Sequence, residues 1–153
     1  MKTTLFSTLL FCAFNLFSAA VSAQTKADET ALNALLKEAY AAFEAKDAHR
    51  FAAIFTDDAS FIPPPGYYTK GKAAIEASHA ELFKMDIKVL KTEIRSSDMR
   101  FLSPDVALYT WTEYQETEWN GQLQKGETVG SVMAVRQNGK WLTATCQLTP
   151  VMN

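Results

Sequence analysis

The stretch AYAAFEAKDAHRFAAIFTDDASFI, residues 39–62, decides the fold because it leads from one helical pattern through a second into a strand. Apolar residues recur at helical spacing from Leu32 to Phe43, with polar and charged residues between them, and this spacing predicts an amphipathic helix. Asp47 is placed to cap a second, shorter helix, which we expect to end at residues 56–58.

A strand, a turn and a third helix are predicted next. The residues ASFI, 59–62, predict a short strand, and Pro63 ends it because proline cannot donate a hydrogen bond to a sheet. The residues PPPGYYTKG, 63–71, then form a stiff turn, which is either the rim of a pocket or a turn whose tyrosines pack in the core. A third helix is predicted over residues 73–84, with His79 on its apolar side.

The second half of the chain is predicted to be an antiparallel meander. Residues 89–148 are rich in Thr, Val, Tyr and Trp, as strands are. Asn-Gly pairs at 120–121 and 138–139 are strong signals for two-residue hairpins. Helices followed by a run of strands indicate an α+β domain.

The hairpins also predict which side chains share a face of the sheet. Pairing outward from the two turns places Thr110 opposite Ser131, and Ser131 opposite Cys146. One face is then almost entirely aliphatic and carries Val106, Leu108, Val129, Met133, Val135, Leu142, Cys146 and Leu148. The other face mixes aromatic and polar side chains: Tyr109, Trp111, Glu113, Thr128, Val132, Trp141, Thr143, Thr145, Gln147 and Thr149.

These two faces need different surroundings. The aliphatic face requires a dry partner, which is either the helices or a second subunit. The mixed face is similar to the lining of a ligand cavity, where apolar walls carry a few polar groups that orient the ligand. A dimer surface and simple exposure to water are the alternatives for the mixed face.

The first residues predict an export signal. Lys2 supplies a positive start, an apolar run follows, and the small residues Val21, Ser22 and Ala23 form a cleavage site. The run is too short to favour a permanent membrane span. We therefore expect cleavage after Ala23, a periplasmic or secreted protein, and a single domain over residues 24–153.

Composition restricts the partners. The chain carries 15 Lys and Arg against 17 Asp and Glu, and no basic cluster is present. This mildly acidic balance argues against nucleic acid or an anionic membrane as partner, so that a small molecule remains. Of the 2 cysteines, Cys12 leaves with the signal, so Cys146 forms no internal disulfide and is expected to be a small core residue.

Four stretches together resemble a known superfamily. They are AYAAFEAKDAHRFAAIFTDDASFI, GYYTKGKAAIEASHAELF, MRFLSPDVALYTW and GKWLTATCQLTPV. In this order they resemble the nuclear transport factor two-like superfamily, and within it the SgcJ/EcaC family and its SnoaL-like relatives. The resemblance implies a cone-like roll of cystatin-like type, with three N-terminal helices packed on a curved, mostly antiparallel sheet. It implies no single reaction, because this fold hosts isomerases, cyclases, hydrolases and non-catalytic pockets.

The chain departs from the isomerases that it resembles. Those enzymes place a carboxylate base a few residues after the FTDDA motif, just before a proline, and here that position is Pro63. The tyrosine of the first helix is also displaced by one residue, because Ala39 stands at the matching position and Tyr40 follows. The resemblance therefore favours a pocket without assured catalysis over an isomerase.

One acid–base residue and six lining residues are predicted. His79 is the candidate catalytic group because imidazole titrates near neutrality; a structural histidine is the alternative. Glu113 shares a face with Trp111, which fits a buried acid, but its place near a hairpin end favours an exposed one. The residues predicted to line the pocket are Tyr40, Phe61, Tyr67, Trp111, Thr128 and Gln147.

Other chemistry is sparse in the sequence. Asp57 and Asp58 are expected in a solvated turn, and Arg95 either in a surface ion pair or beside a ligand carboxylate. Metal-ligand spacing of Cys and His, a glycine-rich phosphate loop and a Ser-His-Asp arrangement do not stand out. We therefore predict no metal and no cofactor.

Two functions follow from these predictions. The first is an exported protein that binds a small, mostly apolar molecule and forms a homodimer through its sheet. The second is a SnoaL-like cyclase, isomerase or hydrolase that uses His79 in an aromatic pocket.

Overall fold

The computed structural model describes residues 26–152 and divides the chain into two units, residues 1–34 and 35–153. In the first unit, residues 26–34 are helical, and the Thr30 hydroxyl donates to the carbonyl of Lys26 over 2.9 Å. The predicted signal peptide lies outside the described residues. Among residues 26–152, none of the helices combines the length and the apolar character that a membrane span requires.

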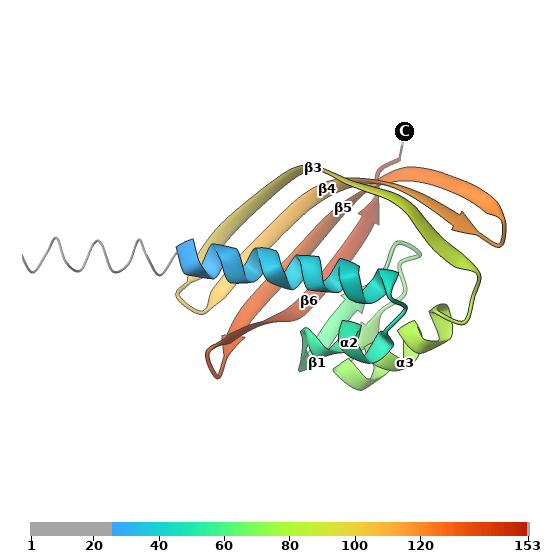
Figure 1. Cartoon of the computed structure of the whole chain (residues 1–153). Coiled ribbons are helices and arrows are strands. Elements are labelled where there is room, and N and C mark those ends of the chain that lie inside the picture. Colours follow the sequence, from blue (N-terminus) through green and yellow to red (C-terminus); the bar gives the residue numbers. More distant parts are fainter. Residues whose placement is uncertain (1–25, 153) are drawn as a thin grey trace, which may run out of the picture. The chain divides into compact units, whose positions relative to one another are not determined.

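The second unit contains helices and strands in an α+β arrangement (Figure 1). Residues 35–44 are helical, as predicted. The elements that follow are α2 (Ala48–Ala53), β1 (Phe55–Ile62), β2 (Thr69–Lys70), α3 (Lys72–Leu82), β3 (Ile87–Ser103), β4 (Val106–Trp119), β5 (Gln122–Gln137) and β6 (Lys140–Pro150).

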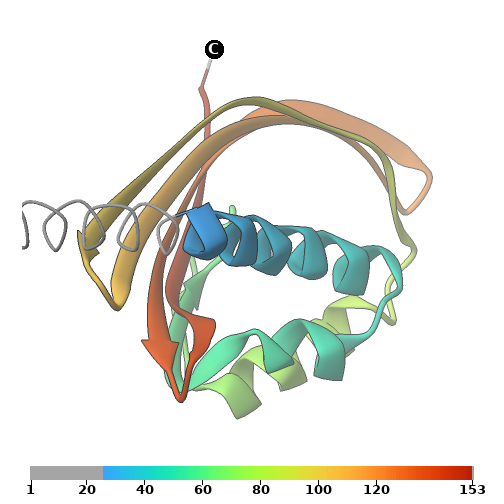
Figure 2. The same cartoon turned by 60° about the vertical axis from the view of Figure 1, so that its left-hand side comes forward.

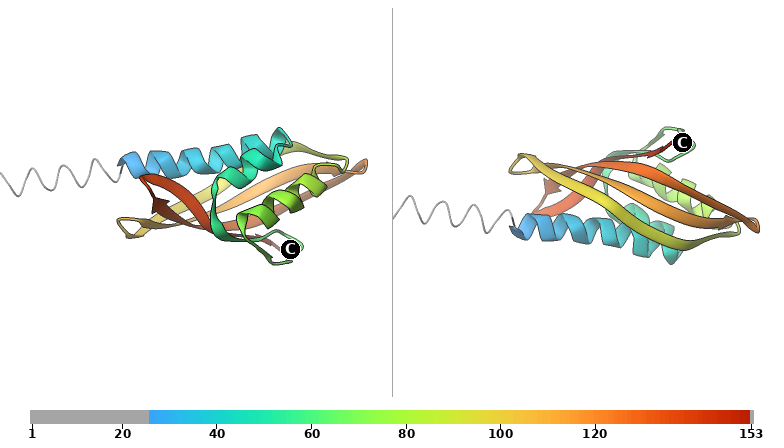
Figure 3. Two further views of the ribbon diagram at one scale, coloured as in Figure 1. Left: turned by 90° about the horizontal axis from the view of Figure 1, so that it is seen from below. Right: turned by 90° about the horizontal axis from the view of Figure 1, so that it is seen from above.

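All six strands form one sheet in the order β2-β1-β6-β5-β4-β3. Neighbours pair antiparallel except β1 and β6, which are parallel. Figure 2 shows the long strands arching over residues 35–44. Figure 3 shows α2 and α3 on the same side of the sheet as residues 35–44, so that one face of the sheet is covered by helices. We call this face the inner face and the opposite one the outer face.

Both Asn-Gly turns are present and set the register of the meander. Asn120 and Asn138 have φ of 49° and 51°, and the glycine after each has φ of 76°. These are the left-handed values that a two-residue hairpin turn requires, and Asn-Gly adopts them most readily. The predicted pairing of β4 with β5 is confirmed, with Thr110 opposite Ser131.

A β-bulge in β6 makes part of the predicted β5–β6 register wrong. Ala134 lies opposite Thr143 but Met133 lies opposite Thr145, so that one residue of β6 is extra. Beyond this point every side chain of β6 is on the face opposite to the predicted one, because strand side chains alternate. Cys146 is therefore buried, and Gln147 is exposed.

The second helix is shorter than predicted and the first strand longer. Asp47 caps α2 as expected, since its Oδ1 accepts from the backbone N–H of Arg50 over 2.9 Å. However, α2 ends at Ala53 and residues 55–58 belong to β1. Pairing with β6 explains the difference, because the N–H of Thr143 donates to the carbonyl of Ile54 over 2.8 Å.

Candidate functional site

The inner face carries the mixed aromatic and polar side chains expected of a ligand site. On β4, alternate residues are buried there, and the same holds on β5 and on the first half of β6. The buried inner-face residues are Ala107, Tyr109, Trp111, Glu113, Gly130, Val132, Ala134, Trp141, Thr143 and Cys146. The prediction of a shared face is thus right for Tyr109, Trp111, Glu113, Val132, Trp141 and Thr143.

Glu113 is the most distinctive group on this face. It is only 4% exposed, although a carboxylate is rarely buried without partners. Its Oε2 accepts a hydrogen bond from the hydroxyl of Tyr40 and another from Nε1 of Trp111, the latter over 3.2 Å. We call these three residues the Glu113 group.

The indole of Trp111 lies flat on the sheet because residue 130 is glycine. A Cβ placed on Gly130 would lie 2.6 Å from Cη2 of Trp111, which is closer than side chains approach one another. The ring of Tyr109 stacks on the indole, with centroids 5.7 Å apart and planes at 27°. Gly130 and Tyr109 therefore hold Nε1 of Trp111 in position to donate to Glu113.

The environment of Glu113 changes the acidity of its neighbours. Burial and the hydrogen bond to the carboxylate both raise the pKa of Tyr40, so that its hydroxyl remains protonated and acts as a donor. Burial, with a smaller contribution from the Glu113 charge, raises the pKa of Cys146 to about 12. Cys146 is therefore a neutral thiol of the interior, as the sequence predicted.

Three of the six predicted lining residues meet at Glu113. Tyr40 and Trp111 donate to it, and Thr128 lies directly opposite it on β5. Tyr40 and Thr128 are half-buried, so solvent reaches this part of the inner face beside them. The sequence placed Glu113 on this face but favoured exposure. Its position two residues after Trp111, in a strand long enough to keep it away from the turn, was the available sign of burial.

His79 lies in a separate aromatic cluster. It is 4% exposed and stacks on Phe51, with centroids 4.0 Å apart and planes at 27°. Phe61, another predicted lining residue, has its ring centroid 5.2 Å from that of His79, and Phe83 and Phe43 complete the surroundings at 5.8 and 6.4 Å.

The polar contacts of His79 hold it in its own helix. Its Nδ1 is 2.8 Å from the carbonyl of Ile75, which requires that Nδ1 carries the proton. Burial lowers the pKa of His79, and this hydrogen bond opposes the effect only in part. A neutral imidazole enclosed by phenylalanines packs like an aromatic core residue.

Two predicted lining residues lie away from both clusters. Tyr67 is 51% exposed in the turn after β1, so the alternative of core-packing tyrosines is wrong. Gln147 is exposed on the outer face, where its Nε2 donates to the hydroxyl of Thr149 over 3.3 Å. The expectation that Gln147 and Trp111 share a face is therefore wrong, because the bulge in β6 separates them.

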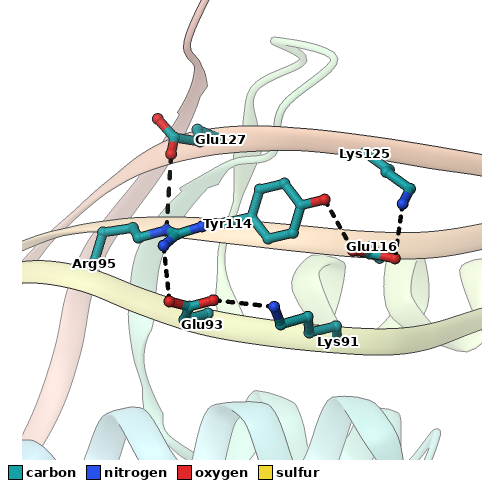
Figure 4. A network of polar contacts seen from close by, with 7 residues as sticks. All are labelled: Lys91, Glu93, Arg95, Tyr114, Glu116, Lys125 and Glu127. Atoms are coloured by element: carbon teal, nitrogen blue, oxygen red, sulfur yellow. Dashed lines mark hydrogen bonds and ion pairs between the residues drawn. The ribbon is translucent and has the colours of Figure 1, made fainter.

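The outer face carries a network of ion pairs over β3, β4 and β5 (Figure 4). Arg95 contacts Glu93 at 2.8 Å and Glu127 at 3.9 Å, so it lies in surface ion pairs, one of the two predicted alternatives. The residues in the network are Lys91, Glu93, Arg95, Tyr114, Glu116, Lys125 and Glu127. Asp57 and Asp58 are exposed as predicted, although they lie in β1 and not in a turn.

Two hollows occur at the surface of the second unit. One, of about 340 Å³, lies beside Lys72 and the β5–β6 turn, and the other, of about 300 Å³, lies beside Phe43 and Ile87. Neither hollow is lined by a member of the Glu113 group. Over residues 26–152, side chains of His, Cys, Asp and Glu do not gather in any group of three or more that would hold a metal ion.

Comparisons with known proteins identify the fold. The sequence profile of the SnoaL-like domain matches residues 32–151. None of the curated protein sequences matches the chain. Several solved structures do, although at low sequence identity.

Three of these structures illustrate the similarity. An uncharacterized protein with a cystatin-like fold from Caulobacter vibrioides is 25% identical with a TM-score of 0.69, covering 81% of this chain and 89% of its own. A ketosteroid isomerase-like protein from Erwinia carotovora atroseptica is 17% identical with a TM-score of 0.70, covering 81% and 96%. An NTF2-like protein of unknown function from Pseudomonas putida is 20% identical with a TM-score of 0.69, covering 84% and 89%. The predicted fold class is thus confirmed.

Proposed function

Because the chain belongs to the SnoaL-like domain family, we propose that it binds a small, mostly apolar molecule against the inner face of its sheet, next to Glu113. The observation that carries this proposal is a carboxyl group, 4% exposed, among aromatic side chains. Burying such a group costs free energy unless it is fully paired, so a buried acid needs a reason beyond packing, and a bound ligand is one.

The Glu113 group fits an uncharged ligand with one polar end. Both donors reach Oε2, and among the described residues Oε1 receives no hydrogen bond. A ligand hydroxyl or N–H is the natural partner for that oxygen. Tyr109 and Trp111, both buried, make the surroundings of Glu113 apolar, which favours an apolar ligand over a charged one.

Acid–base catalysis at Glu113 is the second candidate function. A carboxylate and a phenol in contact are the two groups that a carbon-acid isomerase requires. Glu113 would take a proton from a carbon next to a carbonyl, and the electron pair would move to the carbonyl oxygen. Tyr40 would turn its O–H to that oxygen, and the proton would return to another carbon. With this assignment, Glu113 is the base in place of the carboxylate that the isomerases carry at the position of Pro63. One structural relative bears the name ketosteroid isomerase-like.

Catalysis by His79 has less support than catalysis by Glu113. The Nδ1 proton of His79 is held by the carbonyl of Ile75, and four phenylalanine rings surround the imidazole. These contacts favour the structural role for His79. The assignment to the SgcJ/EcaC family also remains a prediction.

A binding experiment with 6-hydroxy-2-tetralone, a largely apolar bicyclic ketone that carries a hydroxyl and has exchangeable protons beside its carbonyl, separates the two functions. Titration followed by protein NMR should shift the indole N–H signal of Trp111. Glu113→Gln should alter this response, whereas Glu118→Gln, an outer-face control on the same strand, should not. Exchange of the ketone protons in D₂O that depends on Glu113 would establish catalysis, and binding without exchange would establish a binding protein. If 6-hydroxy-2-tetralone and related bicyclic ketones and phenols leave the Trp111 signal unchanged, the proposed site is wrong.

Export is part of the proposed function. The predicted signal over residues 1–23 would deliver a protein beginning at Gln24 to the periplasm or the medium. N-terminal sequencing of the protein recovered from a cell-envelope fraction should begin at Gln24. Recovery of the full chain from the cytoplasm alone would contradict export.

A homodimer through the outer face is the proposed assembly. Val129 and Met133 on β5 are 41% and 38% exposed there, and the adjoining ion-pair network has equal numbers of acidic and basic groups. Such a surface is complementary to a second copy of itself. Sedimentation at micromolar concentration should give about twice the protomer mass, and Met133→Glu should give the protomer mass. Leu90→Glu, at an exposed position on the edge strand β3, is the control. A wild-type protein that sediments as a monomer would remove this part of the proposal.

A further inference from the structure

We propose that Thr92 is a second polar anchor of the Glu113 site, and that the ligand carries two oxygen groups, one for Glu113 and one for Thr92. The inference rests on the proposed function and adds the chemical class of the ligand. It is an uncharged, largely apolar molecule with a hydroxyl at one end and a carbonyl or second hydroxyl at the other.

The register of β3 places Thr92 on the inner face. Thr92 lies opposite Gln115, which is two residues from Glu113 on β4 and shares its face. The residues on either side of Thr92, Lys91 and Glu93, belong to the outer-face network (Figure 4). Thr92 and Glu113 are therefore diagonal neighbours across two strands, a relationship that separates the residues by about 7–8 Å.

Thr92 and Glu113 each have a side-chain oxygen without a hydrogen-bond partner among the described residues. The Oγ1 atom of Thr92 is buried and has no hydrogen-bond partner among the described residues. A buried hydroxyl without a partner is uncommon in native proteins and requires an explanation, such as a bound group. In the same part of the chain, Oε1 of Glu113 also receives no hydrogen bond, because both donors reach Oε2. Two neighbouring groups on one face thus lack a partner that a ligand would supply.

An exposed apolar side chain lies beside these two residues. Ile94 follows Thr92 on the same face of β3 and lies opposite Glu113, and it is 42% exposed. An apolar side chain on a covered sheet face would ordinarily be buried. The exposed side chain of Ile94 gives the apolar part of a ligand a surface to contact.

The chemistry of the two anchors differs, and this difference defines the ligand. A carboxylate only accepts hydrogen bonds, so Glu113 selects a donor such as a hydroxyl. A threonine hydroxyl both donates and accepts, so Thr92 pairs with a carbonyl or a hydroxyl. A bicyclic skeleton that carries an oxygen at each end allows one ligand to present a group to each anchor.

Three probes of one shape test the inference. The first, 6-hydroxy-2-tetralone, carries both oxygens; 2-tetralone lacks the hydroxyl, and 5,6,7,8-tetrahydro-2-naphthol lacks the ketone. Dissociation constants are measured by calorimetry or NMR for the wild type and for Thr92→Val. Thr112→Val, on the outer face of β4, is the control for a threonine that should not touch the ligand.

The expected result is selective. Thr92→Val should raise the dissociation constant of the two-oxygen probe about tenfold, the equivalent of one hydrogen bond. The dissociation constant of the naphthol should not change. The γ-methyl signal of Thr92 should shift when the wild type binds the two-oxygen probe. Glu113→Gln should raise the dissociation constants of both probes that carry a hydroxyl. The urea midpoint of Thr92→Val verifies that the variant is folded.

Failure of this inference is distinguishable from failure of the proposed function. Suppose that binding of the naphthol depends on Glu113 but Thr92→Val binds the two-oxygen probe as tightly as the wild type does. The role proposed for Thr92 is then wrong, and the Glu113 site is retained. If the wild type binds none of the probes, or binds them equally without Glu113, both proposals are wrong.

Discussion

The hydroxyl of Tyr40 donates a hydrogen bond to Oε2 of Glu113 across a separation of 73 residues in the chain. This contact joins the helical residues 35–44 to strand β4 in the interior of the second unit. It combines a buried acid with a donor whose pKa is raised.

The coupling between Tyr40 and Glu113 is measurable. A hydrogen bond to a charged group contributes about 1.5–3 kcal/mol, so Tyr40→Phe should lower the free energy of unfolding by that order. In a double-mutant cycle with Glu113→Gln, the two effects should not add, and the coupling should be about 1 kcal/mol or more. Urea unfolding of the four proteins gives the values. Additive effects would show that the pair does not interact in solution.

Glycine is required at position 130. Gly130→Ala forces the indole of Trp111 off the sheet, so we expect a loss of about 1–3 kcal/mol, as for other overpacked cores, and a changed Trp111 indole N–H signal. Gly126→Ala is the matched control, because nothing lies within 4 Å of a Cβ at Gly126 on the same strand. Equal stability of the two variants would contradict the close packing of Trp111 on Gly130.

His79 should make the fold sensitive to mild acid. Burial lowers the pKa of His79 in the folded state, whereas an unfolded histidine titrates near about 6.5. The unfolded state therefore binds the proton first as the pH falls, and the stability that neutral His79 contributes above about pH 6.5 is lost below it.

The test compares free energies of unfolding at pH 7.5 and pH 5. His79→Phe, which keeps an aromatic ring in the cluster, should show a smaller loss on acidification than the wild type. His49→Gln is the control, since the His49 side chain is 85% exposed, and this variant should keep the wild-type loss. If His79→Phe loses as much free energy of unfolding on acidification as the wild type does, groups other than His79 cause the acid sensitivity.

The thiol of Cys146 should be inert in the folded protein. It is buried and its pKa is raised to about 12, so little thiolate forms at pH 8. We expect no reaction with 5,5′-dithiobis(2-nitrobenzoate) until guanidinium chloride unfolds the chain.

The neighbouring position provides the comparison. In a Cys146→Ser background, Gln147→Cys should react rapidly in the folded state, because residue 147 is exposed on the outer face. The pair of measurements also tests the bulge in β6. If Cys146 reacts in the folded state and the thiol at residue 147 does not, the predicted register without the bulge is correct.

Much of the local structure is determined by short-range rules, and the sequence predicted it for that reason. Asp47 caps α2 because its own carboxylate reaches the N–H of Arg50. Asn120 and Asn138 turn the chain because they adopt positive φ beside a glycine. Each of these features depends on residues a few positions apart, so a pattern of side chains is sufficient to recognise them.

Long-range pairing decided the features that the sequence left open or predicted wrongly. Strand β6 pairs with β5 on one side and with β1 on the other, and the extra residue in β6 adjusts its register between them. That single residue moves Cys146 inward and Gln147 outward. The same pairing draws residues 55–58 into β1, which shortens α2.

The candidate site shows the same division. The sequence by itself determined the α+β class, the hairpin turns and the face that Trp111 and Glu113 share, because turn geometry and alternation along a strand are local. Only the tertiary structure decided that Glu113 is buried and held by Tyr40, because burial depends on which helix covers the sheet and no local pattern records a contact 73 residues away.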